Sequence, residues 1–173
     1  MHRIKNAGCK SKEDVVFTIK KIIDDILAES TSLTLIGGDV SSEFSIFELF
    51  VKMLRKLAGS GRRTFVFVLG NHELWNFPGL SVDEIVDKYR TVLKENGMYL
   101  LHNDLFYRNE SDDMGIIPYD ELIQSDNPAI LEKLRCTRLV ILGGLGFSGY
   151  NEEFNANDGV YRATVDRNTE IQE

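Results

Sequence analysis

Cysteine, proline and histidine are all scarce in this chain of 173 residues. The two cysteines, Cys9 and Cys136, lie far apart and show no CxxC spacing, so neither a disulfide framework nor a thiolate zinc site is indicated. The three prolines leave no proline-rich linker at which a domain boundary would fall. Only three histidines are present, His2, His72 and His102, and this number restricts the metal centres that the chain can build.

Positive charge and long apolar runs are also in short supply. Lys and Arg total 20 against 27 Asp and Glu, a formal charge of -7, so general attraction to nucleic acids or anionic membranes is not expected. The best basic candidate, Arg62-Arg63, is more simply a solvated loop. No apolar run approaches the roughly 18 to 20 residues that span a bilayer, and no secretory apolar core follows the first residues. We expect a cytoplasmic protein without membrane or general nucleic-acid partners, whose oligomeric state stays open.

The hydrophobic content of 43% is enough for one well-packed domain, and we expect a single folding unit over residues 1–173. Apolar spacing predicts an amphipathic helix over 13–29. A second helix is predicted to start at Ser42 or Ser45 and to end at Gly59. A third helix is predicted to open with the capping box Ser81-Val82-Asp83-Glu84 and to close with Asn96-Gly97. A short fourth helix is predicted from Pro128 through Leu134.

Continuous apolar runs at 33–36 and 64–69 predict two buried strands. With the helix between them they form a βαβ unit, so the strands should be parallel, with a right-handed crossover. A short β-hairpin is predicted from residues 99–101 and 105–107 around an Asn103-Asp104 turn. A third buried strand is predicted over 138–142, leading into a glycine-rich loop. The expected fold class is therefore α/β.

Two motifs follow the predicted parallel strands. The first strand ends in Gly37-Gly38-Asp39, and the second in Gly70-Asn71-His72-Glu73. Ligand sites in open α/β sheets usually lie at the carboxyl ends of the strands, where both motifs are placed. One chemistry that needs oxygen ligands at such a site is the hydrolysis of a phosphate ester with two metal ions. Asp39 fits a bridging carboxylate, the Asn71 amide oxygen can ligate a hard cation, and His72 can donate a proton. Alternatively, Asp39 only caps the following helix or turn.

Together, the two blocks resemble the second and third signature blocks of the calcineurin-like metallophosphoesterases. The resemblance implies a layered αββα sandwich and hydrolysis of a small-molecule phosphomonoester or phosphodiester by a two-metal mechanism. It implies Asp39 as the bridging ligand, Asn71 as a ligand of the second metal, His72 as the non-ligating catalytic histidine and Glu73 as a structural partner of the loop. The two divalent ions would be Mn, Fe, Zn or Mg. The serine/threonine protein phosphatase branch is disfavoured, because Gly38-Asp39 is followed by Val40-Ser41-Ser42.

The remaining ligand blocks of that family are missing. Residues 1–38 contain no Asp-x-His, and no histidine follows His102, so no Gly-His-x-His block is present. His102 is the only stand-in for the lone downstream histidine of the family, and its setting resembles a hairpin turn. We therefore expect the chain alone to bind metal weakly or not at all and to be inactive or nearly so.

Two explanations fit this loss. In the favoured one the domain is incomplete at both ends and belongs to a longer enzyme, and in the other the chain is a degenerate relative without catalysis. A non-catalytic phosphoesterase-fold scaffold that binds proteins is thus the alternative function. A weaker rival is a doubly wound nucleotide-binding domain, which the spacing of Gly143-Gly144-Leu145-Gly146 does not support because it lacks G-x-G-x-x-G.

The substrate-binding candidates are less specific. Ser148, Tyr150 and Asn151, in the glycine-rich loop, would line a substrate pocket, or the loop is only a tight structural connection. Trp75 and Phe77 follow the second motif closely. They would form an apolar wall for the leaving group of a substrate, or they pack in the core, which is the commoner fate of aromatic side chains.

Overall fold

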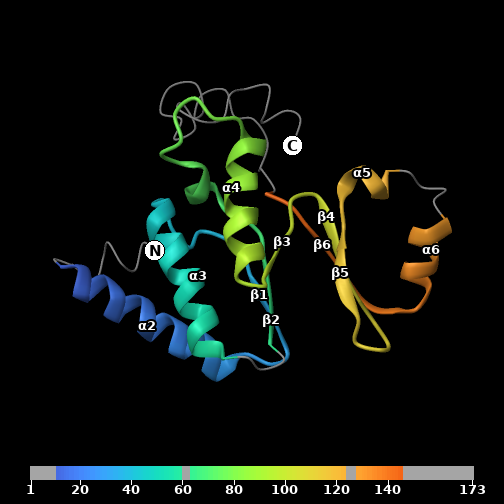
Figure 1. Ribbon diagram of the computed structural model, residues 1–173, viewed down its shortest axis with the longest axis horizontal. Helices are drawn as coiled ribbons and strands as arrows, with labels where there is room; N and C mark the ends of the chain where they lie inside the picture. Colours follow the sequence, from blue (N-terminus) through green and yellow to red (C-terminus); the bar gives the residue numbers. More distant parts are fainter. Residues whose placement is uncertain (1–10, 60–62, 124–127, 146–173) are drawn as a thin grey trace, which may run out of the picture.

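The computed structural model describes residues 11–59, 63–123 and 128–145 (Figure 1). Strands β1 (Leu33–Ile36), β2 (Thr64–Phe67) and β3 (Tyr99–Leu100) form a parallel sheet in the order β1-β2-β3. Strands β4 (Asp104–Asn109), β5 (Met114–Ile117) and β6 (Thr137–Gly143) form an antiparallel sheet in the order β5-β4-β6. The helices are α2 (Lys12–Glu29), α3 (Phe44–Ala58), the 3₁₀ helix η1 (Asn71–Leu74), α4 (Val82–Glu95), α5 (Tyr119–Leu122) and α6 (Pro128–Arg135).

Local hydrogen bonding explains where the longer helices begin. The Ser11 and Ser81 side chains each accept a hydrogen bond from the backbone three residues on, which completes the capping boxes of α2 and α4. Helix α3 starts at Phe44, so the predicted starts at Ser42 or Ser45 are wrong. The Ser41 hydroxyl instead hydrogen-bonds to the backbone of the residue at the N-cap of α3, and this turn delays the helix.

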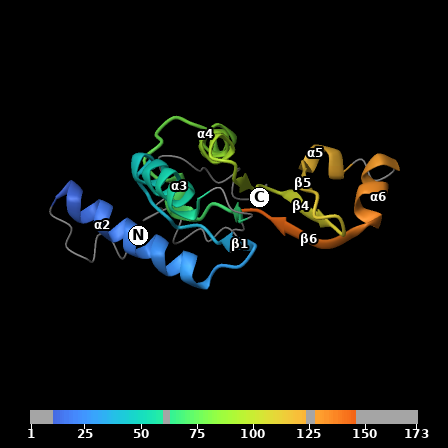
Figure 2. The same ribbon diagram turned by 60° about the horizontal axis from the view of Figure 1, so that its bottom comes forward.

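The two sheets pack face to face, with α2, α3 and α4 in the half that holds the parallel sheet (Figures 1 and 2). Phe65 and Phe67 of β2 belong to the core cluster that includes residues of these helices. Val66, on the other face of β2, packs in a second cluster with Leu101 and with Phe106 of β4. Strand β2 is therefore buried on both faces, as its continuous apolar sequence predicts, and the α/β class is confirmed.

Several local predictions need correction. Residues 99–101 and 105–107 do not form a hairpin, because β3 pairs with β2 in one sheet and β4 lies in the other. Asn103, with a φ of 59°, turns the chain from one sheet into the next. Strand β1 is only partly buried, since Leu35 is 57% exposed. Strand β6 is not buried on both faces either, because Leu142 on its outer face is 70% exposed. The sequence interpretation also missed β5 and α5.

None of the helices in the described ranges is long and apolar enough to cross a membrane. The exposed Cys136 is a free thiol. Phe47 on α3 and Tyr89 on α4 meet edge to face, with ring centroids 4.6 Å apart, and anchor the two helices to each other. This contact lies beneath the loops that follow β1 and β2, so it supports the candidate site.

Candidate functional site

The loops that follow β1 and β2 touch each other at the carboxyl edge of the parallel sheet. A Cβ atom on Gly38 would lie 2.3 Å from the backbone nitrogen of Gly70, and a Cβ on Gly70 would lie 2.2 Å from Oδ1 of Asp39. No side chain fits in either position, so the two glycines allow the loops to approach. Gly38 also has a φ of 81°, a conformation that favours glycine. The predicted meeting of both motifs at one edge is confirmed.

Asp39 joins the two motifs directly. Its Oδ1 accepts a hydrogen bond from the backbone N–H of His72, with an N···O distance of 3.1 Å. The residue is exposed and has a φ of 56°, an unusual value for a side chain other than glycine. It does not cap α3, whose N-cap is Glu43. The helix-capping alternative for Asp39 is therefore wrong, and its carboxylate faces the second motif.

The buried Glu73 carboxylate hydrogen-bonds to the loop after β1 and to the loop after β2. Its side chain is fully buried, and Oε2 accepts hydrogen bonds from the backbone N–H groups of Asp39 and Gly70, both at 2.8 Å. Oε1 accepts a third from the N–H of Ser41 at 2.9 Å. Burial raises the pKa of Glu73 above its ordinary value, and these three hydrogen bonds oppose the rise. Tyr89 donates its hydroxyl to the backbone carbonyl of Glu73 at 3.0 Å, and its own pKa is raised by burial.

Asn71 and His72 are half-buried and lie in η1, the 3₁₀ helix that follows β2. The imidazole of His72 stacks on the indole of Trp75, with ring centroids 3.8 Å apart and ring planes at 30°. Side chains three residues apart eclipse each other in a 3₁₀ helix, so the local helix type brings these two rings together. Phe77 instead packs edge to face on Tyr89 and Phe44, and belongs with the core.

The donors at this edge do not amount to a two-ion centre by themselves. Asp39 and Asn71 offer a carboxylate and an amide oxygen, which suit hard divalent ions. Among residues 11–59, 63–123 and 128–145, no group of three His, Cys, Asp or Glu side chains is placed to hold a metal ion. Two oxygen donors cannot satisfy the coordination of two divalent cations. The described residues thus fit a part of such a centre, not the whole.

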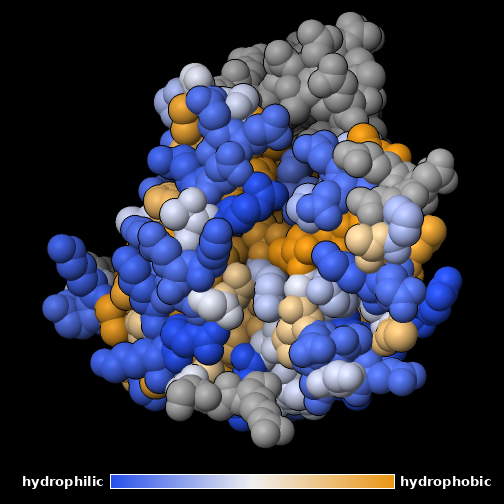
Figure 3. Space-filling model, turned by 45° about the vertical axis from the view of Figure 1, so that its right-hand side comes forward, coloured by the Kyte–Doolittle hydropathy of each residue, from blue (hydrophilic) through white to orange (hydrophobic). Residues whose placement is uncertain are grey.

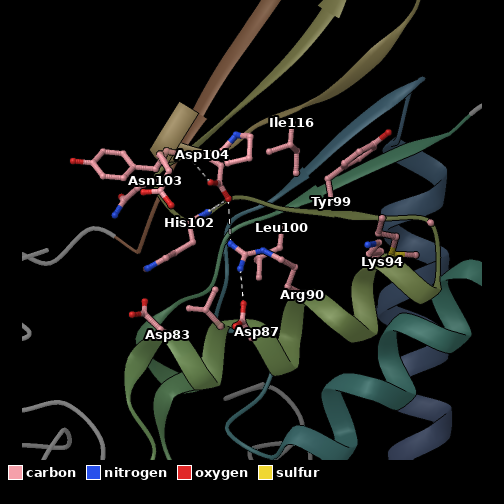
Figure 4. A pocket seen from close by; sticks show the side chains of 16 residues that line it. Asp83, Asp87, Arg90, Lys94, Tyr99, Leu100, His102, Asn103, Asp104 and Ile116 are labelled. Atoms are coloured by element: carbon pink, nitrogen blue, oxygen red, sulfur yellow. Dashed lines mark hydrogen bonds and ion pairs between the residues drawn. The ribbon is translucent and has the colours of Figure 1, made fainter. Parts of the chain in front are cut away.

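His102 lies in a different place, along a cavity of about 990 Å³ between α4 and the β3–β5 region (Figure 4). Asp104 is almost fully buried in the wall of this cavity, where it pairs with Arg90 at 3.2 Å. Neither Asp39 nor His72 is among the described residues that line it. On the face in Figure 3, hydrophobic side chains occupy a depression surrounded by hydrophilic ones. The stand-in role for His102 as a ligand beside Asp39 gains no support from this placement.

The family model described as calcineurin-like phosphoesterase matches residues 10–167. The chain belongs to this family. Calcineurin-like phosphoesterases are metal-dependent hydrolases of phosphoric esters and generally bind two divalent ions. No curated protein and no solved structure matches the chain.

Family membership covers the region that holds both motifs, and the structure brings three of the predicted site residues, Asp39, Asn71 and His72, to one edge. The other three, Ser148, Tyr150 and Asn151, lie outside the described residues. Sequence interpretation placed Trp75 against the substrate or in the core and missed its contact with His72. The i to i+3 spacing of the two aromatic rings in the sequence could have suggested this contact. The contact forms only in a 3₁₀ turn, however, and the sequence alone does not predict that turn.

Proposed function

We propose that this phosphoesterase-family chain carries one part of an active site for metal-dependent hydrolysis of a phosphate mono- or diester, by a two-metal mechanism in the intact protein. The observation that supports the proposal most is the 3.1 Å hydrogen bond between the His72 N–H and the Asp39 carboxylate. It joins the two motifs whose residue types suit this chemistry. These residues do not specify which small-molecule phosphoester is the substrate.

The proposed roles follow from chemistry and position. The Asp39 carboxylate, whose Oδ1 accepts the hydrogen bond from the His72 N–H, and the Asn71 amide oxygen would supply two of the metal ligands. When bound, divalent ions neutralise charge on the phosphoryl oxygens. In the hydrolysis, a water oxygen would form the new bond to phosphorus, and the His72 imidazole would give its proton to the leaving-group oxygen as the ester P–O bond breaks. The Glu73 carboxylate accepts hydrogen bonds from the loop backbone at Asp39, Ser41 and Gly70 and positions these groups.

The 173-residue chain alone is proposed to have little or no activity. Two oxygen donors are too few for two ions, and the sequence contains no Asp-x-His or Gly-His-x-His block to complete the set. We favour the interpretation in which a longer enzyme supplies the remaining ligands. Mn²⁺ is the first ion to test, because carboxylate and amide oxygens suit it as well as Mg²⁺.

The test is hydrolysis of p-nitrophenyl phosphate and of its bis ester in the presence of Mn²⁺. The 173-residue chain is compared with a version extended at both ends along its reading frame. The proposal expects activity in the extended protein and its loss in the Asp39→Asn and His72→Asn variants. Equal activity in both lengths contradicts the incomplete-site interpretation. Activity that both substitutions leave intact contradicts the assigned roles.

A non-catalytic scaffold is the second candidate. The observation in its favour is the lack of a three-ligand metal group within the described ranges. It predicts an extended protein that still lacks the missing histidine blocks, shows no hydrolysis with Mn²⁺ and keeps its fold when Asp39 and His72 are replaced. The two candidates therefore give opposite results in the same assay.

A further inference from the structure

His72 is held at its backbone from two sides. Its N–H donates to Asp39 Oδ1 at 3.1 Å, and its carbonyl accepts a hydrogen bond from the N–H of Trp75 at 3.3 Å. These bonds fix the main chain of the residue but leave rotation of the ring about χ2, which is broad for histidine. A proton donor needs a defined ring direction, because proton transfer depends on hydrogen-bond geometry. The direction of the ring therefore depends on its side-chain contacts.

The contact with Trp75 constrains the ring. The two rings lie 3.8 Å apart between centroids, with their planes inclined by 30°, so the indole covers one face of the imidazole. Only rotations that keep the ring planes nearly parallel preserve this stack. One face of the imidazole is covered by the indole, so a reacting group has to approach the ring from its edge or from the other face.

Hydrogen bonding does not account for the placement of the indole. Its Nε1 is buried and, within the described part of the chain, has no hydrogen-bond partner. An unpaired buried donor is unfavourable, so other contacts must hold the side chain there. Phe77, two residues on, packs in the core, whereas Trp75 lies against the proposed catalytic histidine.

We propose that Trp75 is a positioning residue, which holds the His72 imidazole in the orientation from which it donates its proton. This inference rests on the proposed function for the role of His72, and it adds a residue that neither motif contains. The stack itself is a property of the polypeptide and can be measured without metal or substrate.

Intrinsic fluorescence provides the first test, because the chain contains a single tryptophan. A protonated imidazole in contact with an indole quenches its emission, so the spectra are recorded in mildly acidic buffer. We expect the emission of the metal-free chain to rise in His72→Asn and to stay unchanged in the control His102→Asn, with circular dichroism confirming that both variants fold. Equal emission in the wild type and in His72→Asn would overturn the proposal.

Proton NMR provides a second test that leaves His72 in place. In the wild type, the indole should shift the ring protons of His72 upfield. We expect this shift to disappear in Trp75→Leu and to persist in part in Trp75→Phe, which keeps an aromatic ring. A His72 signal that is unshifted in the wild type, or that is identical in all three proteins, contradicts the stack.

Activity of the extended protein separates this inference from the proposed function. Loss of the stack should lower kcat for p-nitrophenyl phosphate by about three- to tenfold with little change in KM, because a stacked pair contributes about that factor in orientation. Trp75→Phe should recover most of the rate. An unchanged kcat in Trp75→Leu overturns the positioning role even where NMR shows the stack. If the wild-type extended protein does not hydrolyse phosphoesters, the proposed function fails, and Trp75 then positions no proton donor.

Discussion

The Glu73 carboxylate lies 2.8 Å from the backbone nitrogen of Asp39, although 34 residues separate the two in the sequence. The same carboxylate also accepts hydrogen bonds from the N–H groups of Gly70 and Ser41. One buried side chain thus connects the loop after β1 to the loop after β2. The position of Asp39 beside His72 depends on this connection, and the connection can be tested by measurements of stability.

Replacement of Glu73 by glutamine should destabilise the protein. The amide offers one oxygen in place of two and directs its NH₂ group at a backbone N–H, so at least one buried donor loses its acceptor. We expect the free energy of unfolding to fall by about 1–3 kcal/mol in urea denaturation. The matched control is Glu95→Gln, at the exposed end of α4, which should change it by less than about 0.5 kcal/mol. Equal effects of the two substitutions would contradict the role of Glu73.

The effect of Glu73 should also depend on pH. Burial raises the pKa of Glu73 in the folded protein above its unfolded value of 4.5, so the folded state binds the proton more tightly. A raised folded pKa gives a contribution to stability that is full below pH 4.5 and is lost as the pH rises through the folded pKa. Glutamine does not titrate at this position. The advantage of wild type over Glu73→Gln should therefore shrink between acid and neutral pH, and an advantage that grows with pH contradicts the direction of the shift.

Alanine substitutions at the adjacent glycines Gly37 and Gly38 test the contact between the loops after β1 and β2. In Gly38→Ala, the new methyl group would lie 2.3 Å from the nitrogen of Gly70, at a residue with a φ of 81°. We expect a loss of about 1–3 kcal/mol in the free energy of unfolding. Gly37→Ala is the control, since its methyl group would meet nothing within 4 Å. If both variants unfold at the same urea concentration, the loops do not approach as described.

A further prediction concerns the connection between α4 and the second sheet. Asp104 accepts hydrogen bonds from Arg90, from the N–H of Tyr119 at 3.1 Å and from the N–H of His102 at 3.3 Å, and only 9% of its side chain is exposed. Asp104→Asn should lower the free energy of unfolding by about 1–3 kcal/mol, because a buried acceptor is replaced by a donor.

The control for this substitution uses the other partner of Arg90. Asp87 pairs with the same guanidinium at 2.7 Å, but its side chain is 71% exposed. Exposed ion pairs contribute little, so Asp87→Asn should cost less than about 1 kcal/mol. Both variants are compared by thermal or urea unfolding. If their free energies of unfolding fall by similar amounts, the burial of Asp104 does not strengthen its pair with Arg90.

Features encoded in local sequence were predictable, and those that depend on distant pairing were not. The apolar spacing over 13–29 predicted α2, and the capping box at Ser81, whose hydrogen bonds stay within three residues, predicted the start of α4. Strands β3 and β4 were misread as a hairpin because an Asn103-Asp104 turn between short apolar runs is typical of one. The actual pairing depends on contacts between distant segments, such as the packing of Leu101 with Val66 and Phe106 between the sheets.

In the candidate site, too, some features could be predicted from the sequence and others depend on contacts between distant residues. Two parallel strands that end in Gly38-Asp39 and Gly70-Asn71 were enough to predict that the motifs meet. The sequence did not show that the Glu73 carboxylate would accept hydrogen bonds from three backbone groups, because that depends on how closely the glycines let the loops approach. The stack of Trp75 on His72 likewise depends on a 3₁₀ turn.

The proposed role of Asp39 and Asn71 as metal ligands beside His72 can be tested by paramagnetic broadening with Mn²⁺. Small amounts of Mn²⁺ broaden NMR signals near a bound ion even when binding is weak. We expect the Asn71 side-chain amide and the His72 ring to broaden first in the 173-residue chain, and the Asp39→Asn substitution to remove this selectivity. Broadening that begins at acidic residues elsewhere, with Asn71 and His72 unaffected, would contradict it.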